Sequence, residues 1–382
     1  MAFQDHLQFY LENHISPVRQ DISDLEKHLA RRSTLYRRLG LPPRHISGSR
    51  VLEVGPGSGH NSLYLAACRP AALDLVEPNP VGREGISTLY ATFAIDHTPP
   101  RVIPQSLEEY EGSGDYDIVI AEAWLGSTHH ELGMINKLSQ QARRGGILIL
   151  TLQSPVGMFA NVLRRLLAYD LTVGLSDISD RTNVLLEAFG THLSTMRAMS
   201  RLHEDWIQDN LLNPAALTSV LTPSTLLGAL DGYGVYDTYP KLITDWRWYK
   251  ELTGATRSLN PALLECWRQQ THNFLDAGTP AVTTELASNG NAKLEASCQR
   301  LIDYLIDCES RNARPDRKIA LDTVMPVAAL LTGAGSPIAP AINEFIAIYQ
   351  KPAVTASEVA AMSSFCKVFG RELVYISFIR DE

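Results

Sequence analysis

Short apolar runs alternate with helix-like segments between residues 50 and 152. The runs are RVLEV (50–54), ALDLVE (72–77), RVI (101–103), YDIVIAE (116–122) and GILILTL (146–152). Strands that alternate with helices need crossover connections, which place successive strands parallel in one sheet. The pattern therefore predicts an α/β fold with a doubly wound, mostly parallel sheet.

The chain on either side of this region is predicted to be largely helical. Residues 17–39 have apolar positions at helical spacing, with Pro17 suited to the first turn. A second helix is expected over 156–169, followed by a polar stretch without a clear pattern up to about Pro214, and a short helix begins at Pro223.

Residues 255–370 are predicted to be mainly helical, while 234–240 and 372–379 resemble strands. We expect these two strands to return to the sheet and the two insertions, about 156–222 and 247–370, to form a helical cap.

Composition narrows the class of protein. The 382 residues exceed what one small domain needs, and the net charge of −8 disfavours a nucleic-acid partner. No apolar run is long enough to span a bilayer, and the N-terminus lacks the pattern of a signal peptide. Scattered cysteines without a CxxC pair indicate reduced thiols. We therefore expect a cytoplasmic protein with no membrane partner.

The strongest motif lies between the first strand and the following helix. It runs from Glu53 through Gly55, Gly57 and Gly59, and glycines there allow a tight turn and close approach of a ligand. The second strand ends in Glu77, 20 residues after Gly57. This is the spacing at which a carboxylate accepts hydrogen bonds from ribose hydroxyls.

The glycine spacing also bears on the cofactor. A dinucleotide fingerprint starting at Gly55 would need glycine at position 60, which is His60, so a nicotinamide or flavin dinucleotide is the second choice. Residues 50–152 instead resemble class I S-adenosylmethionine-dependent methyltransferases, with their ExGxGxG signature.

The resemblance implies a Rossmann-like core that binds S-adenosylmethionine. It places Glu53 near the methionine end of the cofactor, the glycine turn beneath it, and Glu77 on the ribose. Gln105 and Ser106 correspond to the adenine contacts.

These inferences divide the chain into six segments. They are an N-terminal helical leader or lid (1–48), the S-adenosylmethionine-binding core (49–155), a cap insertion (156–222), a return to the sheet (223–246), a helical cap or substrate domain (247–370) and the final strand (371–382).

The segment after the fourth strand should carry the chemistry, because ligands lie beyond the carboxyl ends of parallel strands. Here His129 is the candidate general base and Glu122 a candidate contact to cofactor or acceptor. Alternatively, His129 and His130 only solvate the start of a helix over 128–143, and Glu122 is a strand-end acid. The D/N-P-P-Y/F sequence of many nitrogen methyltransferases is missing here, and no metal site is indicated.

Two polar and aromatic segments in or beside the insertions, 205–210 and 245–250, are candidates for binding the acceptor. The substrate residues predicted from them are Asp205, Trp206, Asp245, Trp246 and Arg247. Tryptophan beside hydrogen-bonding groups suits a sugar-like or polar aromatic ligand. The alternative is that the tryptophans anchor the cap on the sheet and the charges pair with one another.

The function predicted is methyl transfer from S-adenosylmethionine to a small polar acceptor, with oxygen of a saccharide or secondary metabolite as the expected methylated atom. Two alternatives stay open: a protein methyltransferase with a helical docking domain, and a cofactor-binding module without turnover. A homodimer is also left open as the oligomeric state.

Overall fold

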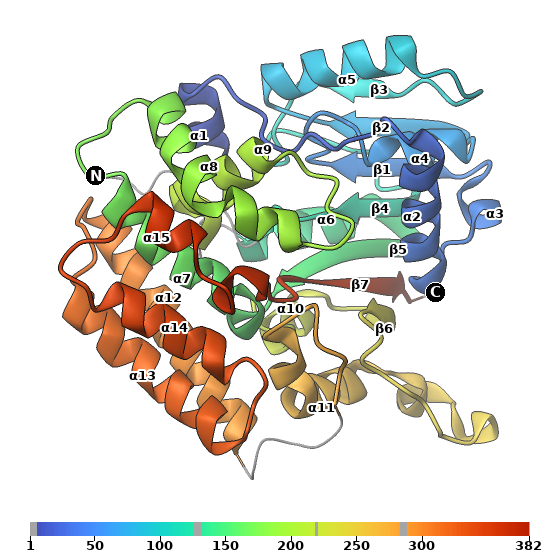
Figure 1. The fold of residues 1–382 in the computed structure, drawn as a ribbon. Helices are drawn as coiled ribbons and strands as arrows, with labels where there is room; N and C mark the ends of the chain where they lie inside the picture. Colours follow the sequence, from blue (N-terminus) through green and yellow to red (C-terminus); the bar gives the residue numbers. More distant parts are fainter. Residues whose placement is uncertain (1–5, 126–130, 218–220, 283–288, 382) are drawn as a thin grey trace. The chain divides into compact units, whose positions relative to one another are not determined.

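The computed structural model describes residues 6–125, 131–217, 221–282 and 289–381 (Figure 1). The chain forms two compact units, each assembled from separate stretches. The α/β unit contains His14–Leu152, Leu221–Trp267 and Leu373–Glu382. The helical unit contains Met1–Asn13, Gln153–Val220 and Arg268–Glu372.

One seven-stranded sheet organises the α/β unit, in the order β3-β2-β1-β4-β5-β7-β6 (Figure 1). The strands are β1 (Arg50–Val54), β2 (Ala72–Val76), β3 (Arg101–Ile103), β4 (Tyr116–Ala121), β5 (Ala142–Gln153), β6 (Tyr233–Tyr239) and β7 (Leu373–Arg380). The pairs β1–β2, β1–β4, β2–β3 and β4–β5 are parallel, and β6–β7 is antiparallel. This confirms the doubly wound, mostly parallel sheet.

The strand order reverses at β1, whose neighbours are β2 and β4. The chain runs outward from β1 to β2 and β3 and then returns to β4 on the other side of β1. Open α/β sheets bind ligands at such a switch point, beyond the carboxyl ends of the strands. The chemistry-bearing segments after β1, β2 and β4 therefore belong to one edge of the sheet.

Helices of the α/β unit cover the sheet. Its parallel strands are apolar on both faces, because both faces of a parallel sheet are buried. The helices are α2 (Leu25–Arg38), α3 (Pro43–Ile46), α4 (Ser62–Ala67), α5 (Pro80–Thr92), α6 (Glu131–Gln141), α10 (Pro223–Ala229) and α11 (Asn260–Gln270). Short 3-10 turns lie at Tyr249–Glu251 and Gly254–Arg257. Tyr36 and Leu39, at and just beyond the end of α2, are fully buried in the same core cluster as Val51 and Ile120.

The leader helix begins later than the apolar spacing predicts. Residues 17–24 are not helical, and α2 starts at Leu25 because the Asp24 carboxylate accepts a hydrogen bond from the Lys27 N–H at 3.0 Å. A second acid, Asp21, accepts from the Ser23 N–H at 2.9 Å and holds a turn just before this cap. Local side-chain hydrogen bonds thus replace the first two helical turns expected after Pro17.

The helical unit consists of helices of 5 to 21 residues. They are α1 (His6–Glu12), α7 (Pro155–Leu171), α8 (Ile178–Thr195), α9 (His203–Ile207), α12 (Gly290–Ser310), α13 (Arg317–Gly333), α14 (Ala339–Tyr349) and α15 (Ala356–Ala360). A π turn covers Gln208–Leu212, and 3-10 turns cover Pro214–Leu217, Thr271–Phe274 and Phe365–Lys367. Helix α12 packs against both α7 and α13, and α15 packs against α8.

Two findings follow for the helical predictions. The expected helix over 156–169 is α7, and the region 255–370 is mainly helical as expected. The polar stretch before Pro214 contains the 18-residue helix α8, which the sequence pattern did not assign. In the described part of the chain, no helix is long and apolar enough to cross a membrane.

Candidate functional site

A tight glycine turn connects β1 to α4. Gly55, Gly57 and Gly59 all have positive φ angles, of 72°, 58° and 78°. Residues with a side chain rarely adopt this left-handed conformation, so all three positions favour glycine. The turn presents backbone, without Cβ atoms, at the carboxyl end of the strand where the sheet order reverses.

The Glu77 carboxylate closes this turn from the end of β2. It accepts hydrogen bonds from the Gly57 N–H and the Asn79 N–H, each at 2.8 Å. Burial raises the pKa of Glu77 to about 7, although both backbone hydrogen bonds favour the ionised form. Glu77 and Gly57, which lie 20 residues apart in the sequence, are therefore in direct contact in the structure.

Glu53, on β1, is a buried carboxyl group, with 3% of its surface exposed. Among the described residues, its Oε2 and the nearby Ser62 hydroxyl lack a hydrogen bond of good geometry, although the Ser62 hydroxyl lies close enough to lower the pKa of this carboxyl. Burial raises the pKa of Glu53 to about 7, and the Glu122 carboxylate adds to this effect. A buried acceptor in this state is costly unless a donor or a cation reaches it, so the carboxyl fits a positively charged ligand group.

Glu122 directly follows β4 and is held by an ion pair from α2. The Arg32 guanidinium lies 2.6 and 2.8 Å from the two carboxylate oxygens, and the Tyr36 hydroxyl donates at 2.6 Å. The side chains of Arg32 and Glu122 are only 9% and 7% exposed. Glu122 thus connects the end of β4 to α2 through an ion pair and a hydrogen bond. A direct catalytic role for Glu122 stays a prediction.

Trp124 is a site residue that the sequence reasoning missed. Its indole N–H donates to the Val54 carbonyl at 2.8 Å, and its ring lies 2.7 Å from where a Cβ on Gly55 would stand. The preceding Ala123 has a φ of 64°, a left-handed turn that aims Trp124 at the glycine turn. An aromatic residue just after the strand adjacent to β1 was the available signal.

Gln105 and Ser106 lie on the turn after β3, and both are half-buried. The Gln105 N–H donates to the Ile103 carbonyl at 2.9 Å. Ser106 exchanges hydrogen bonds with Glu109, at 3.1 and 3.3 Å, so its side chain already shapes the turn. Their assignment to the adenine stays a prediction.

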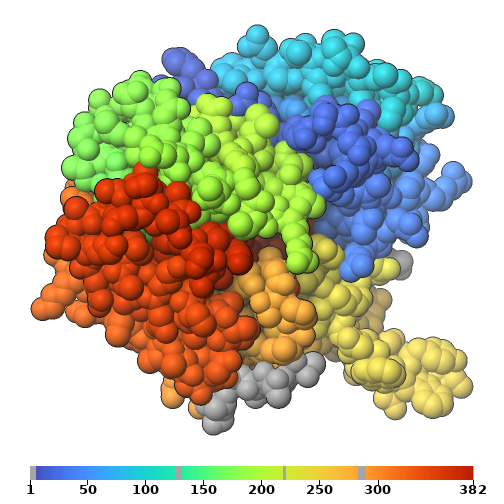
Figure 2. Space-filling view, in the orientation of Figure 1, coloured from blue at the N-terminus to red at the C-terminus, as the bar shows by residue number. Residues whose placement is uncertain are grey.

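Asp245, Trp246 and Arg247 lie on an exposed segment between β6 and α11. The Arg247 guanidinium binds both oxygens of Asp245 at 2.8 Å and also donates to the Ser258 carbonyl at 3.2 Å. Trp246 is 91% exposed, and Figure 2 shows the segment around residues 244–257, in yellow, at the surface. Asp245 and Arg247 thus pair with each other, as in the alternative in which the charges of this segment pair internally. A substrate role for the three residues stays a prediction.

Asp205 and Trp206 belong to the core of the helical unit. Asp205 is fully buried, and Trp206 is 4% exposed with its ring edge-on to Phe369 at 6.1 Å between centroids. Trp206 therefore packs within the helical unit. A role for Asp205 and Trp206 in binding an acceptor stays a prediction, and His129 lies outside the described residues.

The described residues contain no group of three or more histidine, cysteine, aspartate or glutamate side chains placed to hold a metal ion. Within the α/β unit, the structure brings Glu53, Glu77, Glu122 and the three glycines to the same edge of the sheet, with Trp124 over the turn. This arrangement suits a cofactor that carries a cationic group and a polyhydroxylated group.

Comparison with known proteins agrees with this geometry. A family described as "Methyltransferase domain" matches residues 25–235, more than half of the chain. No curated protein matches.

Solved structures that resemble parts of the chain do so at low sequence identity. Magnesium protoporphyrin IX methyltransferase from Synechocystis PCC 6803, with bound S-adenosylmethionine, is 21% identical over 34% of this chain and 57% of that chain, with a TM-score of 0.27. PKMT2 from Rickettsia typhi is 13% identical over 63% of this chain and 49% of that one, with a TM-score of 0.41.

A third such structure is the N-methyltransferase NodS from Bradyrhizobium japonicum WM9 in complex with S-adenosyl-L-homocysteine. It is 15% identical over 38% of this chain and 74% of that chain, with a TM-score of 0.30. The chain thus spans little more than half of the Synechocystis enzyme and less than half of PKMT2. With the family match over residues 25–235 and the glycine turn closed by Glu77, the chain belongs to the class I S-adenosylmethionine-dependent methyltransferase family.

Proposed function

We propose that the protein transfers a methyl group from S-adenosylmethionine to a small polar acceptor, an oxygen atom of a saccharide or secondary metabolite. The observation that carries the proposal is the turn from Glu122 to Leu125 after β4. It has none of the residues of the nitrogen-type D/N-P-P-Y/F sequence, and its Glu122 is tied to Arg32. The net charge of −8 further disfavours a nucleic-acid acceptor.

The residues at the sheet edge fit the cofactor. The buried Oε2 of Glu53 suits the ammonium of the methionine moiety, Glu77 has lone pairs left for ribose hydroxyls, and the glycine turn lets the backbone approach. When bound, S-adenosylmethionine supplies an electrophilic methyl group on sulfur. The protein then has to align the acceptor and accept its proton.

His129 is proposed as the base that accepts this proton, with Glu122 as a neighbouring contact. Asp205, Trp206, Asp245, Trp246 and Arg247 are proposed to position the acceptor. The five cysteines are free thiols, which supports a reducing compartment such as the cytoplasm.

The acceptor class can be tested with S-adenosylmethionine labelled in its methyl group. The full-length protein is incubated with the low-molecular-weight fraction and, separately, with the protein fraction of an extract from the cells that encode it. The proposal predicts label in a low-molecular-weight product, lost in His129→Ala. Label in protein would support the protein methyltransferase instead, and cofactor binding without any labelled product would support a non-catalytic module.

Glu77→Ala is expected to weaken binding of S-adenosylhomocysteine by about 10- to 100-fold. The change removes the ribose acceptor and also frees the Gly57 N–H, and hydrogen bonds to a charged group contribute roughly 1.5–3 kcal/mol. Calorimetric titration measures the effect. Glu111→Ala is the control, because its carboxylate is 92% exposed and lies 3.7 Å from the Lys137 ammonium. Unchanged affinity in folded Glu77→Ala protein would show that the acid is misassigned.

Cofactor binding is expected to release a proton near neutral pH. Burial holds the pKa of Glu53 at about 7, above the ordinary value of 4.5, so much of this carboxyl is protonated in the free protein. A bound ammonium lowers that pKa, and affinity should therefore rise as the pH increases from about 5 to 7. The proton count comes from calorimetry in buffers of different ionisation enthalpy. Glu53→Gln should reduce proton release, leaving only the part from Glu77, and equal release in wild type and variant would contradict the assignment.

A further inference from the structure

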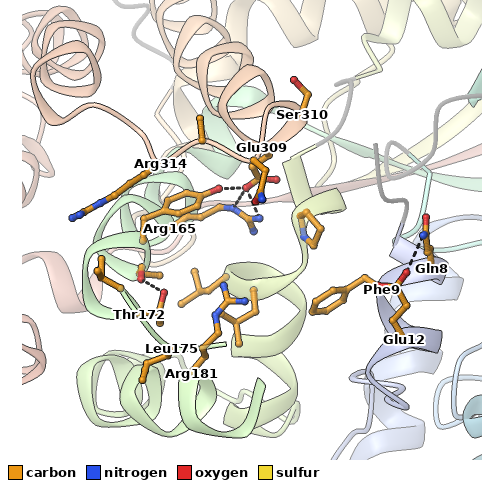
Figure 3. A pocket seen from close by; sticks show the side chains of 18 residues that line it. Gln8, Phe9, Glu12, Arg165, Thr172, Leu175, Arg181, Glu309, Ser310 and Arg314 are labelled. Atoms are coloured by element: carbon orange, nitrogen blue, oxygen red, sulfur yellow. Dashed lines mark hydrogen bonds and ion pairs between the residues drawn. The ribbon is translucent and has the colours of Figure 1, made fainter. Parts of the chain in front are cut away.

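A cavity lies within the helical unit, and none of its lining residues belongs to the glycine turn. It has a volume of about 850 Å³, within the range of small-molecule sites, and residues of α1, α7, α8 and α12 line it (Figure 3). Its apolar wall includes Phe9, Ala168, Leu211, Leu212 and Pro214. The cavity is therefore large enough and apolar enough to hold the body of an organic molecule.

Most charges around this cavity are already paired. Arg165 lies 2.6 Å from Glu309 and also donates to the Asn210 carbonyl at 3.1 Å. Arg314 pairs with Asp170, which is 4% exposed. Of the remaining acids, Glu12 is exposed on α1 and accepts a hydrogen bond from Gln8 at 2.9 Å.

Arg181, in the first turn of α8, is the exception. Among the described residues, no hydrogen bond or ion pair engages its guanidinium, although it is partly buried and lines the cavity. Figure 3 shows it reaching into the cavity from α8 toward the Arg165–Glu309 pair. Burial lowers the pKa of Arg181, and the charge of Arg165 adds to this, so an anion would relieve an unfavourable state.

We propose that this cavity binds an organic anion, with a carboxylate or phosphate group on Arg181 and an apolar body against Phe9, Leu211 and Leu212. The planar guanidinium offers paired donors that match either group, and the wall covers the rest of the ligand. The residues that line this cavity are distinct from those assigned to the cofactor at the sheet edge and from those proposed to position the acceptor.

Four probes test the proposal on the full-length protein by ligand-observed NMR titration. Hexanoate and hexyl phosphate carry both an anion and an apolar body, hexan-1-ol carries only the body, and acetate only the charge. At least one of the two amphipathic anions should bind tenfold or more tightly than hexan-1-ol and acetate, because charge and body must act together.

Arg181→Gln should weaken this binding at least tenfold and leave the affinity for S-adenosylhomocysteine unchanged. Arg311→Gln is the matched control: Arg311 is 63% exposed, lies near the cavity without lining it, and should bind the anions as wild type does. Failure of both amphipathic anions to bind, or equal binding by Arg181→Gln and wild type, would overturn the proposal. Neither result bears on the proposed methyl transfer, which rests on the labelling experiment.

Discussion

Replacing Gly57 with valine is expected to abolish S-adenosylmethionine binding in a protein that still folds. Gly57 has a φ of 58°, and a Cβ there would lie 2.3 Å from the Cγ2 atom of Val18. The Val18 side chain can shift, but a β-branched residue at this position cannot follow the left-handed turn without strain. A strained turn would no longer present its backbone to the cofactor in the same geometry. We expect a loss of affinity of more than about 100-fold, measured by calorimetric titration.

Gly48→Val is the control for this variant. Gly48 also has a positive φ, of 77°, but a Cβ there would meet nothing within 4 Å. Both substitutions therefore carry a similar backbone strain, of about 1–2 kcal/mol, and only the one at position 57 should remove binding. Wild-type affinity in Gly57→Val would mean that the turn does not contact the cofactor. Equal loss in both variants would mean that backbone strain alone is responsible.

Arg32→Ala is expected to cause the largest loss of stability, about 3–5 kcal/mol in the free energy of unfolding. The substitution leaves the Glu122 carboxylate buried without its cation, and this carboxylate already raises the pKa of the nearby Glu53. Urea unfolding measures the change. The pair joins α2 to the end of β4, so the loss should also weaken cofactor binding at the adjacent turn.

Arg143→Ala is the corresponding surface control. Arg143 also pairs with an acid, Asp117, but the two side chains are 61% and 24% exposed, so its loss should cost less than about 1 kcal/mol. Adding Glu122→Gln to Arg32→Ala should recover part of the stability, because the uncompensated charge is gone. Equal losses in the free energy of unfolding for Arg32→Ala and Arg143→Ala would contradict the prediction, because the buried ion pair would then contribute no more to stability than the exposed one.

The sheet could be predicted from the sequence, because each strand has a local signature. The strands expected at 50–54 and 101–103 have exactly the observed bounds, and the two late strands, near 235 and 375, do return to the sheet. Parallel strands are buried on both faces, so each one appears in the sequence as a continuous apolar run. Such a run can be identified without knowing which strands it pairs with. Helix α8 lacks such a signature, because its buried face includes the polar residues Thr182 and His192.

The cofactor site was predictable only as far as its motif is contiguous or regularly spaced. The glycine turn and Glu77 satisfy that condition, and their contact is present. The Arg32–Glu122 pair joins residues 90 positions apart, and no local pattern connects them. Trp124 needs knowledge of which strand adjoins β1, which only the sheet order supplies.

The proposed acceptor residues show a different limit. Tryptophan beside acids and amides has the same composition in a binding site, in a packed core and on a surface turn. The structure contains the latter two: Trp206 packs in the helical unit, while Trp246 is exposed. Composition alone could not distinguish these environments, because burial depends on contacts between distant segments.

The central claim is that the α/β unit binds S-adenosylmethionine, and isothermal titration calorimetry of the purified full-length protein tests it most directly. We predict that S-adenosylmethionine and S-adenosylhomocysteine bind with a dissociation constant in the micromolar range, about 8 kcal/mol, as for a cofactor held by several hydrogen bonds and a glycine turn. Binding of NAD or FAD, with no binding of either S-adenosyl compound, would contradict it.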